Sequence, residues 1–239
     1  MRVLSFSEKG CIRKNNEDSF LVLPSHGIYA VADGMGGHRA GEVASSTALQ
    51  ELEKWAPRLV GLEEQALESG LTEAFVQANK VVYESSTNVP ENAGMGTTLT
   101  VLLVRDETFV IAHVGDSRAY LWRDETLTSL TIDHSLVGEL VRLEQISPEE
   151  AEKHPQRHVL MRAVGADQKI ELDCKSISLQ MGDVFLLCTD GFSNMISNQE
   201  LGEHFLEPDS WEGRFEKLRK LTLERGAPDN FTALCCILE

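Results

Sequence analysis

Hydrophobic residues near the start of the chain form short runs and then two amphipathic stretches. The short runs are bounded by polar or turn residues and predict strands at 3–7, 19–23 and 27–32. In the following segments, 43–55 and 67–82, apolar side chains recur at the spacing of one helical face. The sequence therefore predicts three strands and then two helices, each of which buries one face.

Further runs of β-branched and apolar residues occupy the middle of the chain. These runs lie at 98–104, 108–114, 119–123 and 127–131 and are separated by short polar turns. Such a succession predicts an antiparallel meander.

The next segment, 133–162, is polar and mixed, and it predicts a surface insertion. A short helix is expected at 136–143, and a second helix is expected to begin at Ser147-Pro148-Glu149-Glu150, where the serine caps and the proline takes the first turn.

The last part of the chain predicts strands, a helix and a final strand. The strands are expected at 170–179 and 184–189, and the closing strand at 231–238. Between them, Trp211 and Thr222 bound a helical apolar face. Strands outnumber helices without alternating with them, so an antiparallel α+β fold is favoured over a parallel sheet. No linker or repeat divides the chain, and one domain over 1–239 is expected.

The charge balance narrows the possible partners. Of 239 residues, 38 are acidic and 22 are basic, which gives a net charge of −16. Such a surface repels nucleic-acid phosphates and anionic lipids, so neither a nucleic-acid partner nor a membrane is expected. The five cysteines form no C-x-x-C pair, and the N-terminus carries no extended apolar segment. These features predict a cytoplasmic protein.

Several carboxylates stand at the ends of predicted strands. Asp33 follows one apolar run, Asp190 follows another, and Asp229 precedes the final strand. Asp116 lies in a turn between two strands of the predicted meander, and Glu17-Asp18 precedes a further strand. Each aspartate alone could be an ordinary turn residue. Together they suggest converging carboxylates, which must be hydrogen-bonded, paired or metal-bound when buried.

Oxygen ligands of this kind select Mg²⁺ or Mn²⁺ over zinc or copper. Gly34 and Gly191 follow two of the aspartates and would let the backbone come close to a ligand. The histidines show no metal-binding spacing, although His38 and His134 each stand beside an acidic motif.

With these motifs in order, the chain resembles the metal-dependent protein phosphatases of the PP2C-like (PPM) family, in particular their short bacterial single-domain members. The resemblance spans the chain and rests on segments that occur in the family's order. These segments are Arg13-Lys14-Asn15-Asn16-Glu17-Asp18, Asp33-Gly34-Met35-Gly36-Gly37-His38, Met95-Gly96-Thr97-Thr98, Val114-Gly115-Asp116-Ser117-Arg118, Asp133-His134-Ser135, Leu160-Met161-Arg162-Ala163-Val164-Gly165, Thr189-Asp190-Gly191 and Asp229-Asn230-Phe231-Thr232.

The resemblance implies a β-sandwich of two antiparallel sheets flanked by pairs of helices, with residues 133–162 as a flap beside the active site. It implies two metal ions in a core site, and Asp33, the Gly34 carbonyl, Asp190 and Asp229 as their ligands. A weaker third ion would bind Asp116.

Four further residues receive roles from the same resemblance. Glu17 and Asp18 would act near the metals through waters, Arg13 would clamp the phosphate, and His38 could protonate the leaving alkoxide. In longer relatives the histidine follows the Asp-Gly directly, whereas three residues intervene here.

The expected activity is hydrolysis of phosphoserine and phosphothreonine in proteins by a metal-activated water, in a monomer that opposes a bacterial serine/threonine kinase. Three alternatives remain open at this point: a catalytically silent module that binds phosphoproteins, an acidic cation-binding protein, and a hydrolase of small phosphate esters.

Overall fold

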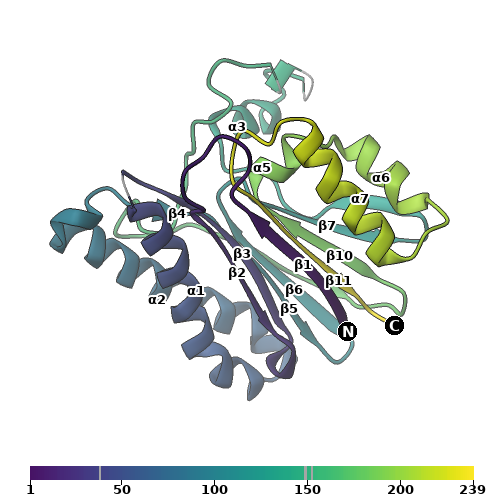
Figure 1. Cartoon of the computed structure of the whole chain (residues 1–239). Coiled ribbons are helices and arrows are strands. Elements are labelled where there is room, and N and C mark those ends of the chain that lie inside the picture. The colour runs from purple at the N-terminus through teal and green to yellow at the C-terminus, as the bar shows by residue number, and fades with distance from the viewer. Residues whose placement is uncertain (38, 148–149, 152) are drawn as a thin grey trace.

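Two antiparallel sheets pack face to face, and helices cover the outer face of each (Figure 1). The structure is a computed structural model and describes residues 1–37, 39–147, 150–151 and 153–239. Of the expected helix start at Ser147-Pro148-Glu149-Glu150, Pro148 and Glu149 lie outside the described residues, whereas Glu150 N donates to Ser147 Oγ at 3.2 Å, as a serine cap requires. The predicted sandwich of two antiparallel sheets is confirmed.

The first sheet holds both ends of the chain. Its strands, in spatial order, are β1 (Arg2–Glu8), β11 (Phe231–Ile237), β10 (Val184–Cys188), β7 (Arg118–Arg123) and β8 (Thr126–Ser129). β1 pairs with β11 from Arg2 opposite Ile237 to Glu8 opposite Phe231, which brings the two termini side by side (Figure 1). β10 and β11 are buried along their whole length, as their continuous apolar runs require.

The second sheet carries the other strands. In spatial order they are β2 (Asp18–Leu23), β3 (Ile28–Met35), β5 (Leu99–Arg105), β6 (Thr108–Val114) and β9 (Asp173–Ser178), and the short β4 (Gly96–Thr97) also pairs with β3.

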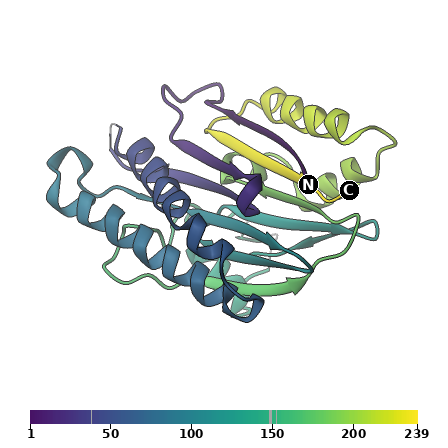
Figure 2. The same cartoon turned by 90° about the horizontal axis from the view of Figure 1, so that it is seen from below.

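The helices form a pair on each outer face (Figure 2). The pair on the second sheet is α1 (Ala40–Val60) and α2 (Leu67–Asn88), and the pair on the first is α6 (Asn198–Leu206) and α7 (Trp211–Glu224). The described residues also form the short helices α3 (Leu136–Arg142) and α5 (Asp190–Ser193) and the 3₁₀ turns η1 (Pro24–His26), η2 (Glu64–Ala66) and η3 (Pro90–Asn92). The sequence pattern missed α6, although Ser197 and Glu200 form a capping box at its start.

Three apolar layers hold this stack together. The first lies between α1–α2 and the second sheet and includes Ala48, Leu52 and Phe75. The second fills the space between the two sheets, where Phe109 and Phe185 meet edge to face with ring centroids 4.6 Å apart. The third lies between the first sheet and α6–α7. Burial on both faces explains why the central strands carry apolar residues at consecutive positions rather than only at alternate ones.

The predicted meander over 98–131 is confirmed for the pairs β5–β6 and β7–β8 but wrong at the step from β6 to β7. β6 and β7 are consecutive but belong to different sheets, because residues 115–117 carry the chain across the sandwich. β6 pairs with β9 and β7 with β10. The apolar runs identify the strands, but every strand offers the same backbone donors and acceptors to any neighbour.

The segment 133–162, the predicted flap, leaves and re-enters the fold at one place. Ser135 and Leu160 form an antiparallel bridge, and Met161 N donates to His134 O at 2.8 Å. α3 stands above the end of the sandwich (Figure 1). In the described ranges of the chain, no helix combines the length and the apolarity that crossing a bilayer requires.

Candidate active site

Two of the proposed carboxylates lie next to each other on paired strands of the second sheet. Asp18 on β2 is the register partner of Asp33 on β3. Asp33 does not follow its strand, as the sequence suggested, but lies within it, because β3 continues to pair with β4. Its backbone is held on one side by Thr98, whose Oγ1 accepts from Asp33 N at 2.8 Å, and by Thr97, whose Oγ1 donates to Asp33 O at 2.8 Å. Asp33 is thus fixed by neighbouring strands.

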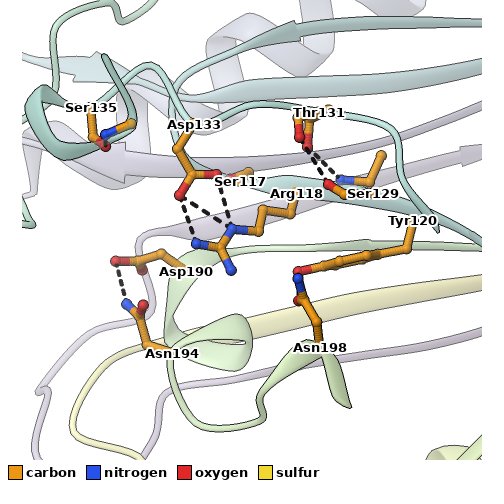
Figure 3. A network of polar contacts seen from close by, with 12 residues as sticks. Ser117, Arg118, Tyr120, Ser129, Thr131, Asp133, Ser135, Asp190, Asn194 and Asn198 are labelled. Carbon is orange, nitrogen blue, oxygen red and sulfur yellow. Dashed lines mark hydrogen bonds and ion pairs between the residues drawn. The ribbon is translucent and has the colours of Figure 1, made fainter. Parts of the chain in front are cut away.

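Two further carboxylates come from the first sheet. Asp190 begins α5 directly after β10, and Asn194 Nδ2 donates to its Oδ2 at 3.1 Å (Figure 3). Asp229 precedes β11, and Asn230 N donates to its Oδ1 at 2.8 Å. The carboxyl groups of Asp33 and Asp190 lie close enough that each affects the pKa of the other. The site therefore lies where the ends of the two sheets meet.

The electrostatics of this cluster are unfavourable for negative charge. Burial raises the pKa of Asp33 well above its ordinary value, and repulsion from neighbouring aspartates adds to the effect. Burial likewise raises the pKa of Asp18 to about 7 and that of Asp116 to about 8. The pKa of Asp190 is also raised by burial. Full ionisation of the group requires compensating positive charge, from cations or from basic side chains.

Asp116 lies in the crossing between the two sheets. The preceding Gly115 has φ +112°, and a Cβ at that position would stand 2.5 Å from Thr98 Cγ2. Thr98 Oγ1 and Ser117 Oγ are hydrogen-bonded at 2.7 Å, which ties the crossing to the residue just before β5. Only glycine fits this turn, and the turn presents Asp116 to the cluster.

The N-terminal loop, residues 9–17, brings Arg13 and Glu17 to the same place. Arg13 Nη2 contacts Asp229 Oδ2 at 2.6 Å, and this contact raises the pKa of the guanidinium. Burial raises the pKa of the Glu17 carboxyl. Ser45 Oγ on α1 donates to Glu17 O at 2.6 Å and anchors the end of the loop. Arg13 is more than half exposed, so its remaining donors can reach a ligand.

Backbone packing around Gly34 is tight. A Cβ at Gly34 would stand 2.0 Å from Gly41 O and 2.7 Å from Glu17 O. A Cβ at Gly191 would stand 1.9 Å from Asn230 O. These two glycines bring α1, the N-terminal loop and the start of β11 into contact, and any side chain there would push the acidic residues apart.

The donor set fits divalent cations of the hard type. Asp18 Oδ2 accepts from Thr189 Oγ1 at 2.8 Å, whereas its buried Oδ1 has no hydrogen-bond partner among the described residues. Within those same residues, no three acidic, histidine or cysteine side chains are grouped so as to hold a metal ion by themselves. Coordination would therefore need backbone carbonyls and waters besides carboxylates, which is how Mg²⁺ is usually bound.

Arg118 is a site residue to which sequence reasoning gave no role. Its guanidinium forms a bidentate pair with Asp133, with Nη2 to Oδ2 at 2.7 Å and Nε to Oδ1 at 2.9 Å (Figure 3). Its charge also lowers the pKa of Asp116 and Asp190, although burial outweighs this effect. Arg118 thus joins the first residue of the flap to the acidic cluster. Its position in the Gly115-Asp116-Ser117-Arg118 motif was the sequence feature that could have identified it as a site residue.

The two singled-out histidines have different outcomes. His134 lies behind the site: its Nδ1 accepts from Gly115 N at 3.3 Å, and its Nε2 is 3.4 Å from Asp173 Oδ2. Burial lowers the pKa of His134. His38 lies outside the described residues, so the general acid stays a prediction from the sequence.

The fold is that of a known enzyme family. The profile of the family described as protein phosphatase 2C matches residues 12–229. The chain therefore belongs to the protein phosphatase 2C family.

Individual relatives resemble the whole chain. A serine/threonine phosphatase, Stp, of Listeria monocytogenes is 38% identical over 232 residues, which cover 95% of this chain and 92% of the relative. The crystal structure of the Mycobacterium tuberculosis serine/threonine phosphatase PstP/Ppp superposes with a TM-score of 0.89 at 38% identity, covering 100% of this chain and 98% of that one. A structure of the PstP catalytic domain in complex with two manganese ions has a TM-score of 0.86 at 34% identity, covering 100% and 98%.

Proposed function

We propose that this chain is a metal-dependent phosphatase that removes phosphate from serine and threonine residues of proteins, with Mn²⁺ or Mg²⁺ as the cofactor. The observation that carries the proposal is the convergence of Asp33, Asp190 and Asp229 from two different sheets on one acidic cluster. The serine/threonine phosphatase relatives and the manganese complex of PstP support the same activity.

In this proposal, Asp33, the Gly34 carbonyl, Asp190 and Asp229 hold two cations, with Glu17 and Asp18 acting through waters, and Asp116 binds a weaker third cation. When bound, such cations lower the pKa of a coordinated water and neutralise charge on the phosphoryl oxygens. They would also offset the carboxylate repulsion described above.

The chain's own residues bind and orient the substrate. The exposed guanidinium of Arg13 offers a planar fork of donors to the phosphate, which suits bidentate recognition. The pair of Arg13 with Asp229 keeps that fork at the edge of the acidic cluster. His38 is proposed to donate a proton to the leaving serine or threonine oxygen. Catalysis then rests on positioning and electrostatics rather than on a protein nucleophile.

The biological setting is proposed from chemistry. A protein phosphatase acts on the products of a protein kinase, so a cognate serine/threonine kinase is the expected counterpart. All five cysteines are unpaired thiols, and Cys188, Cys235 and Cys236 are buried in strands. This usage supports a reducing compartment, and we propose that the enzyme acts in the cytoplasm as a monomer, with one phosphatase domain over residues 1–239.

Metal removal tests the function. The purified chain with Mn²⁺ should hydrolyse both an aryl phosphate and a phosphothreonine peptide, and EDTA should abolish both activities, which excess Mn²⁺ should restore. Release of inorganic phosphate is the measurement. Binding of the phosphopeptide without any release would favour the silent-module alternative. Hydrolysis of the aryl phosphate alone would favour a small-ester hydrolase.

The third-ion assignment has a separate test. Asp116→Ala should lower turnover by about tenfold to a hundredfold while binding of the first two ions stays nearly unchanged, because Asp116 lies in the crossing rather than on the β3 or β10 side of the cluster. Isothermal titration calorimetry with Mn²⁺ measures how many ions each protein binds. An equal loss of all ions would make Asp116 a structural turn residue.

A further inference from the structure

The side chain of Asn230 contacts one segment of the chain three times. Its Oδ1 accepts from Glu17 N at 2.9 Å, and its Nδ2 donates to Lys9 O at 2.9 Å and to Asn15 O at 2.8 Å. Asn230 is 6% exposed. Both amide hydrogens and the amide oxygen are therefore directed to the N-terminal loop, the segment that carries Arg13.

This loop has few other attachments. The structure describes every residue from 9 to 17, and they form neither a helix nor a strand. Cys11 N donates to Ala227 O at 2.9 Å, Asn16 Nδ2 donates to Ser7 Oγ at 2.8 Å, and Glu17 O accepts from Gly34 N at 3.2 Å and from Ser45 Oγ. The remaining attachment to the described residues is the contact of Arg13 with Asp229. The stretch 11–15 is exposed to solvent. Such a segment opens easily unless buried contacts hold it.

We propose that Asn230 is a positioning residue that holds the N-terminal loop against the acidic cluster and so fixes Arg13 for binding phosphate. The inference rests on the proposed role of Arg13. Asn230 follows Asp229 directly, and its own N–H donates to Asp229 Oδ1. Asn230 thus orients the Asp229 carboxylate through its backbone N–H. Through its side chain it anchors the loop whose Arg13 contacts that same carboxylate.

The chemistry of the position favours asparagine. The two backbone carbonyls of Lys9 and Asn15 need donors, and Glu17 N needs an acceptor. Aspartate would place a carboxylate oxygen against two carbonyl oxygens, and alanine would leave all three groups without their partner.

Asn79 on α2 offers a matched control. It is 2% exposed, its Nδ2 donates to Asp167 O at 3.0 Å and to Gln168 O at 3.3 Å, and its Oδ1 accepts from Gly165 N at 2.7 Å. It therefore makes the same three kinds of hydrogen bond as Asn230, but to a different loop. Asn79→Ala and Asn230→Ala should lower the melting temperature by similar amounts.

Limited trypsin digestion separates the two variants. The N-terminal loop contains Arg13 and Lys14, and cleavage after them should be roughly tenfold faster in Asn230→Ala than in the wild-type chain or in Asn79→Ala. The digestion uses the chain without added metal, so its outcome does not depend on phosphatase activity. Equal cleavage rates in the two variants would overturn the proposal.

Kinetics and hydrogen exchange complete the test. With Mn²⁺, Asn230→Ala should raise KM for an aryl phosphate by about tenfold and change kcat less, whereas Asn79→Ala should leave KM unchanged. If Asn230→Ala does not fold, exchange in the wild-type chain decides: the Glu17 amide should exchange at least about tenfold more slowly than that of exposed Ile12. Equal exchange, or an unchanged KM, would contradict the inference. If the wild-type chain shows no phosphatase activity with Mn²⁺, the proposed function is refuted, but the digestion result remains valid.

Discussion

Replacing Asp190 with asparagine should abolish phosphatase activity, with a loss on the order of 10³-fold in kcat/KM. The substitution keeps the size of the side chain and an oxygen that can accept from Asn194, but it removes a charge that we propose holds a cation. The initial rate of phosphate release at saturating Mn²⁺ measures the effect.

The same substitution should have the opposite effect on the stability of the metal-free chain. Burial and the nearby Asp229 raise the pKa of Asp190, so its charge is unfavourable without a cation. Asp190→Asn should therefore melt at or above the wild-type temperature in EDTA, while the stabilisation that Mn²⁺ gives the wild-type chain should be lost. Asp167→Asn, at an exposed position, is the control and should change neither quantity. Retained activity in Asp190→Asn would refute the metal assignment.

Replacing Asp183 with alanine should destabilise the fold by about 3 kcal/mol. The Asp183 side chain is fully buried, and its carboxylate accepts from Arg123 Nε at 2.7 Å, from Arg123 Nη2 at 2.6 Å and from Gln180 N at 2.9 Å. Its removal leaves the Arg123 guanidinium, which is 22% exposed, with Ser178 O as its remaining acceptor, and leaves Gln180 N without its acceptor. For a chain of 239 residues, thermal denaturation should show a decrease in Tm of roughly 6–12 °C.

An exposed ion pair provides the comparison for Asp183. Arg142 contacts Glu139 on α3, and both side chains are largely open to solvent. Glu139→Ala should leave the melting temperature unchanged, because exposed pairs are screened and contribute little. If the two substitutions lowered the melting temperature equally, burial would not explain the role of Asp183.

The strands were predictable because burial on both faces leaves a clear mark on the sequence. The boundaries expected for β6, 108–114, are those observed, and β10 and β11 each differ by one residue at one end. The local pattern predicted the neighbouring pairs β5–β6 and β7–β8, but it did not predict which strands distant in the chain pair. It also missed α6, whose nine residues bury only Leu201 and Phe205 and so give a weak apolar period.

The candidate site likewise has residues that the sequence identified and residues that only the structure revealed. Strand-end positions and motif order marked Asp33, Asp190 and Asp229 in the sequence. The roles of Arg118 and Asn230 were not evident there, because each depends on partners distant in the chain. Arg118 pairs with Asp133, and the hydrogen-bond partners of Asn230 lie 213 to 221 positions away.

The sequence by itself therefore determined the strands, the two long helices and the acidic residues of the site, because hydrophobic periodicity and residue chemistry are local properties. Tertiary structure alone decided that β6 and β7 lie in different sheets, and that Asp33 on one sheet and Asp190 at the end of the other lie close enough for each to affect the pKa of the other. Backbone hydrogen bonds can form between any two strands, so pairing is selected by packing of the whole core.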